Sequence, residues 1–149
     1  MNEKFFDLKK EKQDRMINAS LKVFAMNGYA HASTDDIVRE AGISKGLLFH
    51  YFVSKLGLYS FIYDYSIRYV ILELTTGVDK EETDYFRLVG QIREAELQVM
   101  RNYPCMMLFL NNSRLENVSE VLLETEDKRN ILSEKYAQIL SQATGEELD

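Results

Sequence analysis

The stretch from Ser33 to Lys55 constrains the fold of this chain more than any other, because it predicts two short helices joined by a tight turn. Ser33 or Thr34 can cap the first helix with a side-chain oxygen, and the acidic residues that follow suit its first turn. Gly42 is expected to end that helix, since glycine adopts the left-handed conformation at little cost. Ser44 can then cap the second helix. This order of elements is the sequence pattern of a helix-turn-helix.

The second of these helices carries side chains that suit contact with DNA. Phosphates or base edges are within reach of Ser44, Lys45, His50, Tyr51 and Lys55. Leu48 and Phe52 are four residues apart, so they are expected to pin the helix to the body of the protein. From spacing alone, a helical hairpin inside any all-α protein fits as well as a DNA reader does, because short helix-turn-helix patterns are common.

A wider set of caps, glycines and aromatic residues resembles the N-terminal signature of TetR-family transcriptional regulators. The matching positions fall within residues 9–60 and are Ala19, Phe24, Gly28, Tyr29, Thr34, Ile37, Ala41, Gly42, Ile43, Ser44, Gly46, Phe49, Tyr51, Phe52, Ser54 and Lys55. The resemblance implies an all-α fold, with a DNA-binding unit over residues 1–55 and a helical ligand-binding and dimerisation domain over residues 56–149. It says little about residues beyond 75, because that second domain varies greatly between family members.

The resemblance also assigns DNA contacts position by position. Phosphate-binding positions of the family fall at the start of the first helix of the motif, at the start of its second helix and at the start of the helix after that. The second helix of the motif is the recognition helix of the family. Leu47 matches a base-reading position, where leucine can contact a thymine methyl group. The residues implied to bind DNA are Thr34, Ser44, Lys45, Gly46, Leu47, Phe49, His50, Tyr51 and Lys55.

Four positions depart from the family pattern. Phe49 replaces the commoner tyrosine and so lacks a phosphate-binding hydroxyl. Val53 stands where a basic residue is frequent, and Leu56 and Gly57 stand where acidic residues are frequent. We expect these changes to weaken the electrostatic attraction to DNA and to leave the helix that follows Ser54 poorly capped.

The remaining chain reads as helices throughout, with no strand signal. The apolar periodicity predicts helices over Lys9–Asn27, Ser54–Thr75, Asp84–Arg101 and Cys105–Leu110, then a last helix or pair of helices that Asn117 and Glu120 would open as a capping box. The helix after Ser54 is apolar almost all round. It is therefore expected to be buried on several sides and to join the two domains.

Charge and composition bear on partner and compartment. Residues 1–55 hold nine Lys and Arg against seven Asp and Glu, a net +2, whereas residues 56–149 hold nine against seventeen, a net −8. This distribution restricts attraction to a polyanion to one face. No apolar run reaches the ~18 residues of a membrane span, and the N-terminus lacks a secretory signal. With one cysteine, the sequence predicts a cytoplasmic protein.

Catalytic chemistry finds little support in the sequence. His31 and His50 lie far apart, Cys105 sits among apolar residues, and no metal-ligand spacing, phosphate loop or nucleophile motif is present. We therefore expect neither an enzyme nor a cofactor. A small apolar or aromatic effector is expected instead, in a cavity lined by Tyr65, Tyr69, Met100, Met107 and Tyr136, although such side chains at helical spacing are more often core than pocket.

Two functions follow as hypotheses. The first is a sequence-specific regulator, a repressor released by its ligand, which binds an inverted-repeat operator in double-stranded DNA as a homodimer. The alternative is an all-helical ligand carrier or adaptor that keeps the helix-turn-helix only as scaffold. The chain ends at Asp149, so the family's two C-terminal dimerisation helices are expected to be missing. Pairing is then expected through Cys105–Leu110 and an apolar stripe made of Leu132, Tyr136, Ile139, Leu140 and Ala143.

Overall fold

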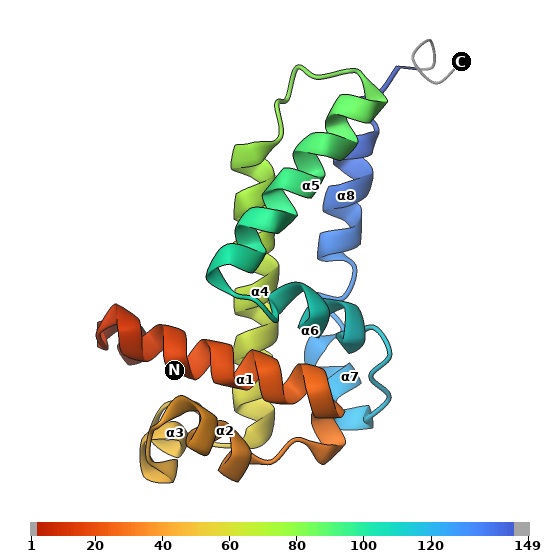
Figure 1. The fold of residues 1–149 in the computed structure, drawn as a ribbon. Coiled ribbons are helices and arrows are strands. Elements are labelled where there is room, and N and C mark those ends of the chain that lie inside the picture. Colours follow the sequence, from red (N-terminus) through yellow and green to blue (C-terminus); the bar gives the residue numbers. More distant parts are fainter. Residues whose placement is uncertain (1–2, 145–149) are drawn as a thin grey trace.

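The structure is a computed structural model that describes residues 3–144. These residues form a short 3-10 helix and eight α-helices without any strand, which confirms the all-α prediction. Figure 1 shows α1 to α3 gathered at one end of the long helix α4, with α5 and α8 beside its other half, α6 across its middle and α7 beside the end of α1. The elements are η1 (Glu3–Asp7), α1 (Lys10–His31), α2 (Thr34–Ala41), α3 (Lys45–Phe52), α4 (Lys55–Gly77), α5 (Tyr85–Asn102), α6 (Met106–Ser113), α7 (Ser119–Thr125) and α8 (Ile131–Leu140).

Local capping explains the ends of α2 and α3 as the sequence predicts. The Ser33 hydroxyl accepts hydrogen bonds from the N–H groups of Asp35 and Asp36, and Gly42 ends α2 with a φ of 69°. The Ser44 hydroxyl accepts from Leu47 N–H and so opens α3. Regular helix in α1 ends at Gly28, whose φ is 74°, as expected for a helix over Lys9–Asn27. The turn of the helix-turn-helix is thus specified by residues within it.

The N-terminal segment packs into the body, which the sequence analysis did not predict. The ring of Phe5 is fully buried, and its centroid lies 5.4 Å from that of Phe52 and 5.2 Å from that of Phe61. The side-chain amide of Gln13 donates hydrogen bonds to the carbonyl oxygens of Phe6, at 3.0 Å, and Leu8, at 2.7 Å. Together these contacts hold η1 against α1, α3 and α4.

Helix α4 is the spine that its apolar composition predicts, and it runs two residues beyond the expected Thr75. It contacts α1, α3, α5, α6, α7 and α8. Its buried side chains are Leu58, Tyr59, Ile62, Tyr63, Ser66, Ile67, Val70 and Leu74. Leu72 on the same helix is 56% exposed. Packing on α4 therefore connects the helix-turn-helix to every later helix.

Two expectations for the C-terminal half, the end of α6 and the capping box, are wrong in detail. Residues Asn111 to Ser113, expected to close α6, belong to it, because the Asn112 side chain donates to the carbonyl of Ala25 and fixes α6 on α1. The capping box at Asn117 is absent, since α7 begins at Ser119 without a side-chain cap. The last segment is a pair of helices, α7 and α8, separated by a polar turn. The end of the chain from Gly145 to Asp149 lies outside the described residues.

Candidate nucleic-acid interface and effector cavity

The residues implied to bind DNA gather at the end of the molecule formed by α2 and α3 (Figure 1). The exposed members are Ser44, Lys45, Gly46 and His50. The half-buried members are Thr34, Leu47, Phe49, Tyr51 and Lys55. The structure thus brings all nine to one region but does not present them equally.

The N-terminus of α3 is the most open part of this region. Gly46 is exposed, and apart from its chain neighbours and the backbone of α3 no atom lies within 4 Å of the position that a Cβ would occupy. The first turn of α3 contains no acidic residue. Because the first N–H groups of a helix lack partners within it and carry partial positive charge, this end suits a phosphate group.

Lys45 is paired on the surface of the free protein. Its ammonium lies 2.9 Å from the carboxylate of Asp35, and the two side chains are 54% and 64% exposed. Exposed pairs of this kind contribute at most about 1 kcal/mol. A phosphate group can therefore replace Asp35 as the partner of Lys45 at little cost.

Lys55 has protein partners instead of an open path to solvent. Its ammonium donates to the carbonyl oxygens of Tyr29, at 2.8 Å, and Ala32, at 3.2 Å, and lies 4.4 Å from the centroid of the Tyr29 ring. These bonds satisfy carbonyls at the end of α1 and tie them to the start of α4. In this arrangement Lys55 positions the helix-turn-helix, and its contact with phosphate stays a prediction.

Tyr51 and His50 differ in their surroundings although they are neighbours. The Tyr51 ring packs edge-on against Phe5, with centroids 5.9 Å apart, and is half-buried. His50 is exposed and meets the Tyr51 ring at 5.0 Å. The geometry gives Tyr51 a packing role and leaves the imidazole of His50 accessible to a ligand.

A tight γ-turn connects α3 to α4. Val53 has φ 70° and ψ −44°, and the N–H of Ser54 donates to the carbonyl of Phe52 at 2.7 Å. This conformation is strained for a β-branched residue. The Ser54 hydroxyl accepts from Gly57 N–H at 2.9 Å, so the expectation of a poorly capped α4 is wrong. A Cβ on Gly57 would overlap the Phe52 carbonyl, which accounts for glycine where the family often has an acidic residue.

The residues expected to bind an effector do not converge. A cavity of about 510 Å³ lies among α4, α5, α6 and α8, and Met107 and Tyr136 line it. Tyr65 and Tyr69 line a separate groove with Phe6 and Phe61. Met100 lines neither and is 38% exposed. The cavity also has polar lining residues that the sequence analysis missed, among them Glu96, Arg114 and Arg129.

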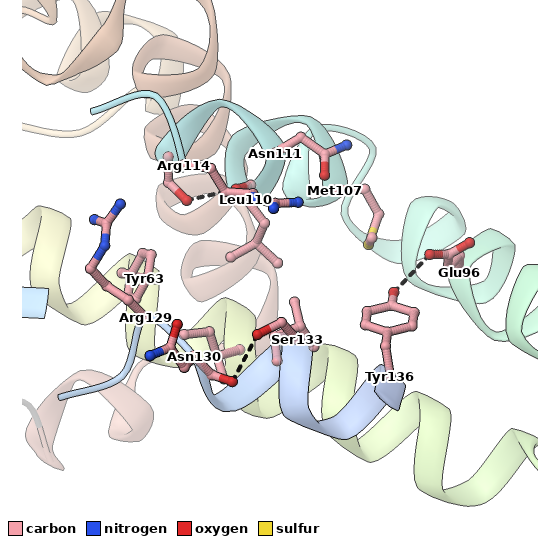
Figure 2. A pocket seen from close by; sticks show the side chains of 13 residues that line it. Tyr63, Glu96, Met107, Leu110, Asn111, Arg114, Arg129, Asn130, Ser133 and Tyr136 are labelled. Carbon is pink, nitrogen blue, oxygen red and sulfur yellow. Dashed lines mark hydrogen bonds between the residues drawn. The ribbon is translucent and has the colours of Figure 1, made fainter. Parts of the chain in front are cut away.

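Two polar features distinguish the cavity. The Tyr136 hydroxyl donates to Glu96 at 2.7 Å and links α8 to α5 (Figure 2). Burial, together with this bond and the nearby carboxylate charge, raises the pKa of Tyr136 above its ordinary value of 10, so the phenol stays neutral. The two arginines lie on the side of the cavity that Tyr63 forms. Both arginines fall in polar stretches that the sequence marks only as turns.

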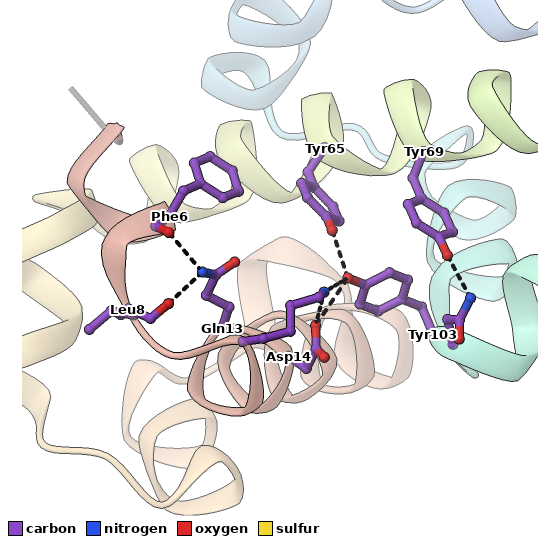
Figure 3. Close-up of polar contacts among 9 residues, drawn as sticks. Phe6, Leu8, Gln13, Asp14, Tyr65, Tyr69 and Tyr103 are labelled. Atoms are coloured by element: carbon purple, nitrogen blue, oxygen red, sulfur yellow. Dashed lines mark hydrogen bonds and ion pairs between the residues drawn. The ribbon is translucent and has the colours of Figure 1, made fainter.

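A hydrogen-bonded cluster joins the other face of α4 to α1 (Figure 3). Tyr103 donates to Asp14 at 3.1 Å, and Lys10 approaches the same carboxylate at 2.7 Å. Burial is the main reason that the pKa of Tyr103 is raised to about 12. Tyr69 accepts a bond from Asn102 at 2.7 Å. The predicted pair Tyr65 and Tyr69 thus contributes to a structural contact between α4 and the end of α5.

Within residues 3–144, no group of three or more His, Cys, Asp and Glu side chains is arranged to hold a metal ion. None of the described helices combines the length and the apolar character needed to cross a bilayer.

Comparison with known proteins identifies the helix-turn-helix region. Residues 16–60 match the model of the family described as bacterial regulatory proteins, tetR family. The uncharacterised HTH-type transcriptional regulator YuxN of Bacillus subtilis is 38% identical over 93 residues, which cover 60% of this chain and 32% of YuxN. The regulator TtgW of Pseudomonas putida, also uncharacterised, is 40% identical over 47 residues, 32% of this chain and 35% of TtgW. The chain thus spans about a third of the length of these curated relatives.

The fold agrees with this match beyond the N-terminal region. A crystal structure described as a tetR family transcription regulator from Shewanella sp. PV-4 superposes with a TM-score of 0.56 at 23% identity, over 89% of this chain and 65% of that one. The similarity of fold thus extends over the helices that follow the helix-turn-helix. Residues 16–60 thus match the tetR family of bacterial regulatory proteins, and the fold of the chain as a whole is similar to that of a protein described as a tetR family regulator.

Proposed function

We propose that the chain is a sequence-specific DNA-binding repressor, cytoplasmic and not an enzyme, which a small molecule in the cavity among α4, α5, α6 and α8 releases from its operator. The observation that supports DNA binding best is the open N-terminus of α3, where Gly46 exposes the backbone and Lys45 is held only by a surface pair. Net charge supports it as well, since residues 1–55 are basic and residues 56–149 are acidic.

Removal of the charge of Lys45 tests whether the N-terminus of α3 contacts the DNA backbone. Binding of the full chain to an inverted repeat beside its coding region is measured by fluorescence anisotropy over a range of salt concentrations. Lys45→Ala is expected to weaken specific and non-specific binding alike and to reduce the salt slope by about one counterion. Lys80→Ala, an exposed lysine in the loop before α5, is the matched control and should bind as the wild type does. Unchanged affinity of Lys45→Ala at every salt concentration would refute a contact between Lys45 and DNA.

Helix α4 provides a route for control by a ligand. It begins at Lys55, beside the recognition helix, and its side chains Tyr63 and Ile67 line the cavity. An effector that binds one tilt of α4 better than another would shift the spacing of paired recognition helices. A ligand that fills the cavity yet leaves operator affinity unchanged would exclude this route.

Pairing of two chains is part of the proposal, because one short recognition helix reads too few base pairs to be selective. Apolar side chains on α5, α6 and α8 are available for a partner, and Leu97, Met100, Leu108, Ile131 and Leu140 are each 38–45% exposed. We propose a homodimer through α6 and α8, and sedimentation at micromolar and nanomolar concentrations tests it. A strict monomer that occupies an inverted repeat as a single copy would overturn it.

The carrier or adaptor hypothesis keeps specific support. Lys55 is bonded to main-chain carbonyls, Lys45 faces Asp35, and Phe49 has no hydroxyl, so the free protein offers few uncommitted groups to phosphate. A chain that binds a ligand but no inverted repeat, even at low salt, would favour this alternative.

A further inference from the structure

The cavity among α4, α5, α6 and α8 has two chemically different ends (Figure 2). At one end the carboxylate of Glu96 accepts the hydroxyl of Tyr136. At the other end Arg129 lies beside Tyr63, and Arg114 lies on the same side. A molecule inside therefore meets negative charge at one end and positive charge at the other.

Neither arginine is paired with a carboxylate in the part of the chain that the structure describes. Among residues 3–144, neither Arg114 nor Arg129 forms an ion pair, although nine other Lys and Arg side chains there do so. Burial raises the pKa of Tyr63, and the positive charge of Arg129, which is itself half-buried, opposes that effect. A partly desolvated guanidinium gains most from an anion that can accept two parallel hydrogen bonds.

Apolar side chains line part of the space between the two ends. Ile67 of α4, Met107 and Leu110 of α6 and Leu132 of α8 contribute to its lining. A volume of about 510 Å³ falls within the ~300–1,000 Å³ that is usual for sites of small molecules. These side chains can contact a hydrocarbon or aromatic body, while Asn111, Asn130 and Ser133 add polar groups to the lining.

We propose that this cavity binds a small amphiphilic anion, with a carboxylate at Arg129 and Arg114 and an apolar body that extends towards Met107. Glu96 excludes a second anionic group from the far end and sets the direction in which the molecule lies. The inference deepens the proposed function by giving the chemical class of the effector, yet binding itself depends only on the cavity.

The first experiment uses the wild-type chain and three probes of one length. Octanoate, 1-octanol and octylamine are titrated by isothermal calorimetry, and shifts of the melting temperature are recorded in parallel. Octanoate is expected to bind at least about tenfold more tightly than octanol, a difference of about 1.4 kcal/mol, and octylamine more weakly still. Equal affinity for octanoate and octanol would overturn the proposal.

Matched variants assign the charge. Arg129→Gln is expected to reduce octanoate affinity about tenfold or more while leaving octanol affinity unchanged. Arg93→Gln, at an exposed position of α5 outside the cavity, is the control and should bind octanoate as the wild type does. Glu96→Gln removes a repelling charge and is expected to bind octanoate as tightly as the wild type or more tightly. Weaker binding by Glu96→Gln, or wild-type binding by Arg129→Gln, would refute the assignment.

The same titrations separate this inference from the proposed function. If octanoate binding depends on Arg129 but does not change operator affinity, the anion site is supported and its role as the effector site is refuted. The opposite result is also possible. If the chain binds its operator but binds octanoate and octanol equally, and octanoate does not change operator affinity, then DNA binding stands and the anion site is refuted.

Discussion

The hydroxyl groups of Tyr65 and Tyr103 lie 2.6 Å apart and share a hydrogen bond between α4 and the residue that follows α5. Tyr103 uses its own proton to donate to Asp14, so Tyr65 is the donor in this pair. Lys10 completes the cluster through Asp14. The chain of bonds connects α4, the end of α5 and the first turn of α1.

Removal of the central hydroxyl is expected to loosen this connection. Tyr103→Phe deletes the bond to Asp14 and the acceptor for Tyr65, which we expect to lower the free energy of unfolding by about 1–2 kcal/mol. Urea unfolding at neutral pH measures the loss. Tyr85→Phe, which removes a hydroxyl from a half-buried tyrosine at the start of α5, serves as control and should unfold as the wild type does. Equal midpoints for Tyr103→Phe and wild type would contradict the expected coupling.

Alkaline pH is expected to unfold the protein through its buried phenols. Burial is the largest cause that raises the pKa of Tyr103 and of Tyr29 to about 12, from an ordinary value of 10. The unfolded chain thus loses these protons first, so stability is fully present below pH 10 and falls as the pH rises towards 12. Urea midpoints and tyrosinate absorbance across this interval measure the effect. Tyr103→Phe should show a shallower decline, and a slope equal to that of the wild type would count against the assignment.

Lys55 allows a structural role to be separated from a DNA contact. Lys55→Met would leave the carbonyl oxygens of Tyr29 and Ala32 without their donor, and we expect a loss of about 2 kcal/mol in the free energy of unfolding. Lys9→Met, at an exposed position before α1, is the control. Chemical unfolding and anisotropy on the same operator measure the two roles in parallel. Wild-type stability with weakened DNA binding would assign Lys55 to phosphate alone.

Phe5 is expected to be the main anchor of the N-terminal segment. Phe5→Ala empties a fully buried site among Phe52 and Phe61, and the expected cost is about 3–5 kcal/mol. Phe6→Ala removes a ring that is 50% exposed and should cost much less. Chemical unfolding of both variants measures the difference, and similar losses at the two positions would show that the segment has no single anchor.

Local signals in the sequence account for the parts of the fold that were predicted well. The caps at Ser33 and Ser44 and the turn at Gly42 each depend on residues a few positions apart, so their chemistry is visible in a single stretch. Phe5 gave no such signal. It stands in a short charged segment without periodicity, and its partners come from α3 and α4.

The effector site was harder to predict, since α4 is apolar on nearly every side. Tyr65 and Met107 were expected to meet, yet they lie in different hollows, because α5 and α6 pack on α4 where the sequence does not mark a preferred face. Lys55 illustrates the same limit. Its type fitted a phosphate ligand, whereas its two acceptors belong to residues more than twenty positions earlier.

The γ-turn at Val53 couples the position of α3 closely to that of α4. Only Val53 and Ser54 separate the two helices, and the carbonyl of Phe52 is fixed by the N–H of Ser54. Helix α4 has 23 residues and is therefore about 34 Å long. A pivot of about 5° at its far end displaces Lys55 by about 3 Å, close to the ~3.4 Å spacing of neighbouring base pairs. In the proposed DNA complex, a pivot this small would therefore displace the start of α4 by about the distance between neighbouring base pairs.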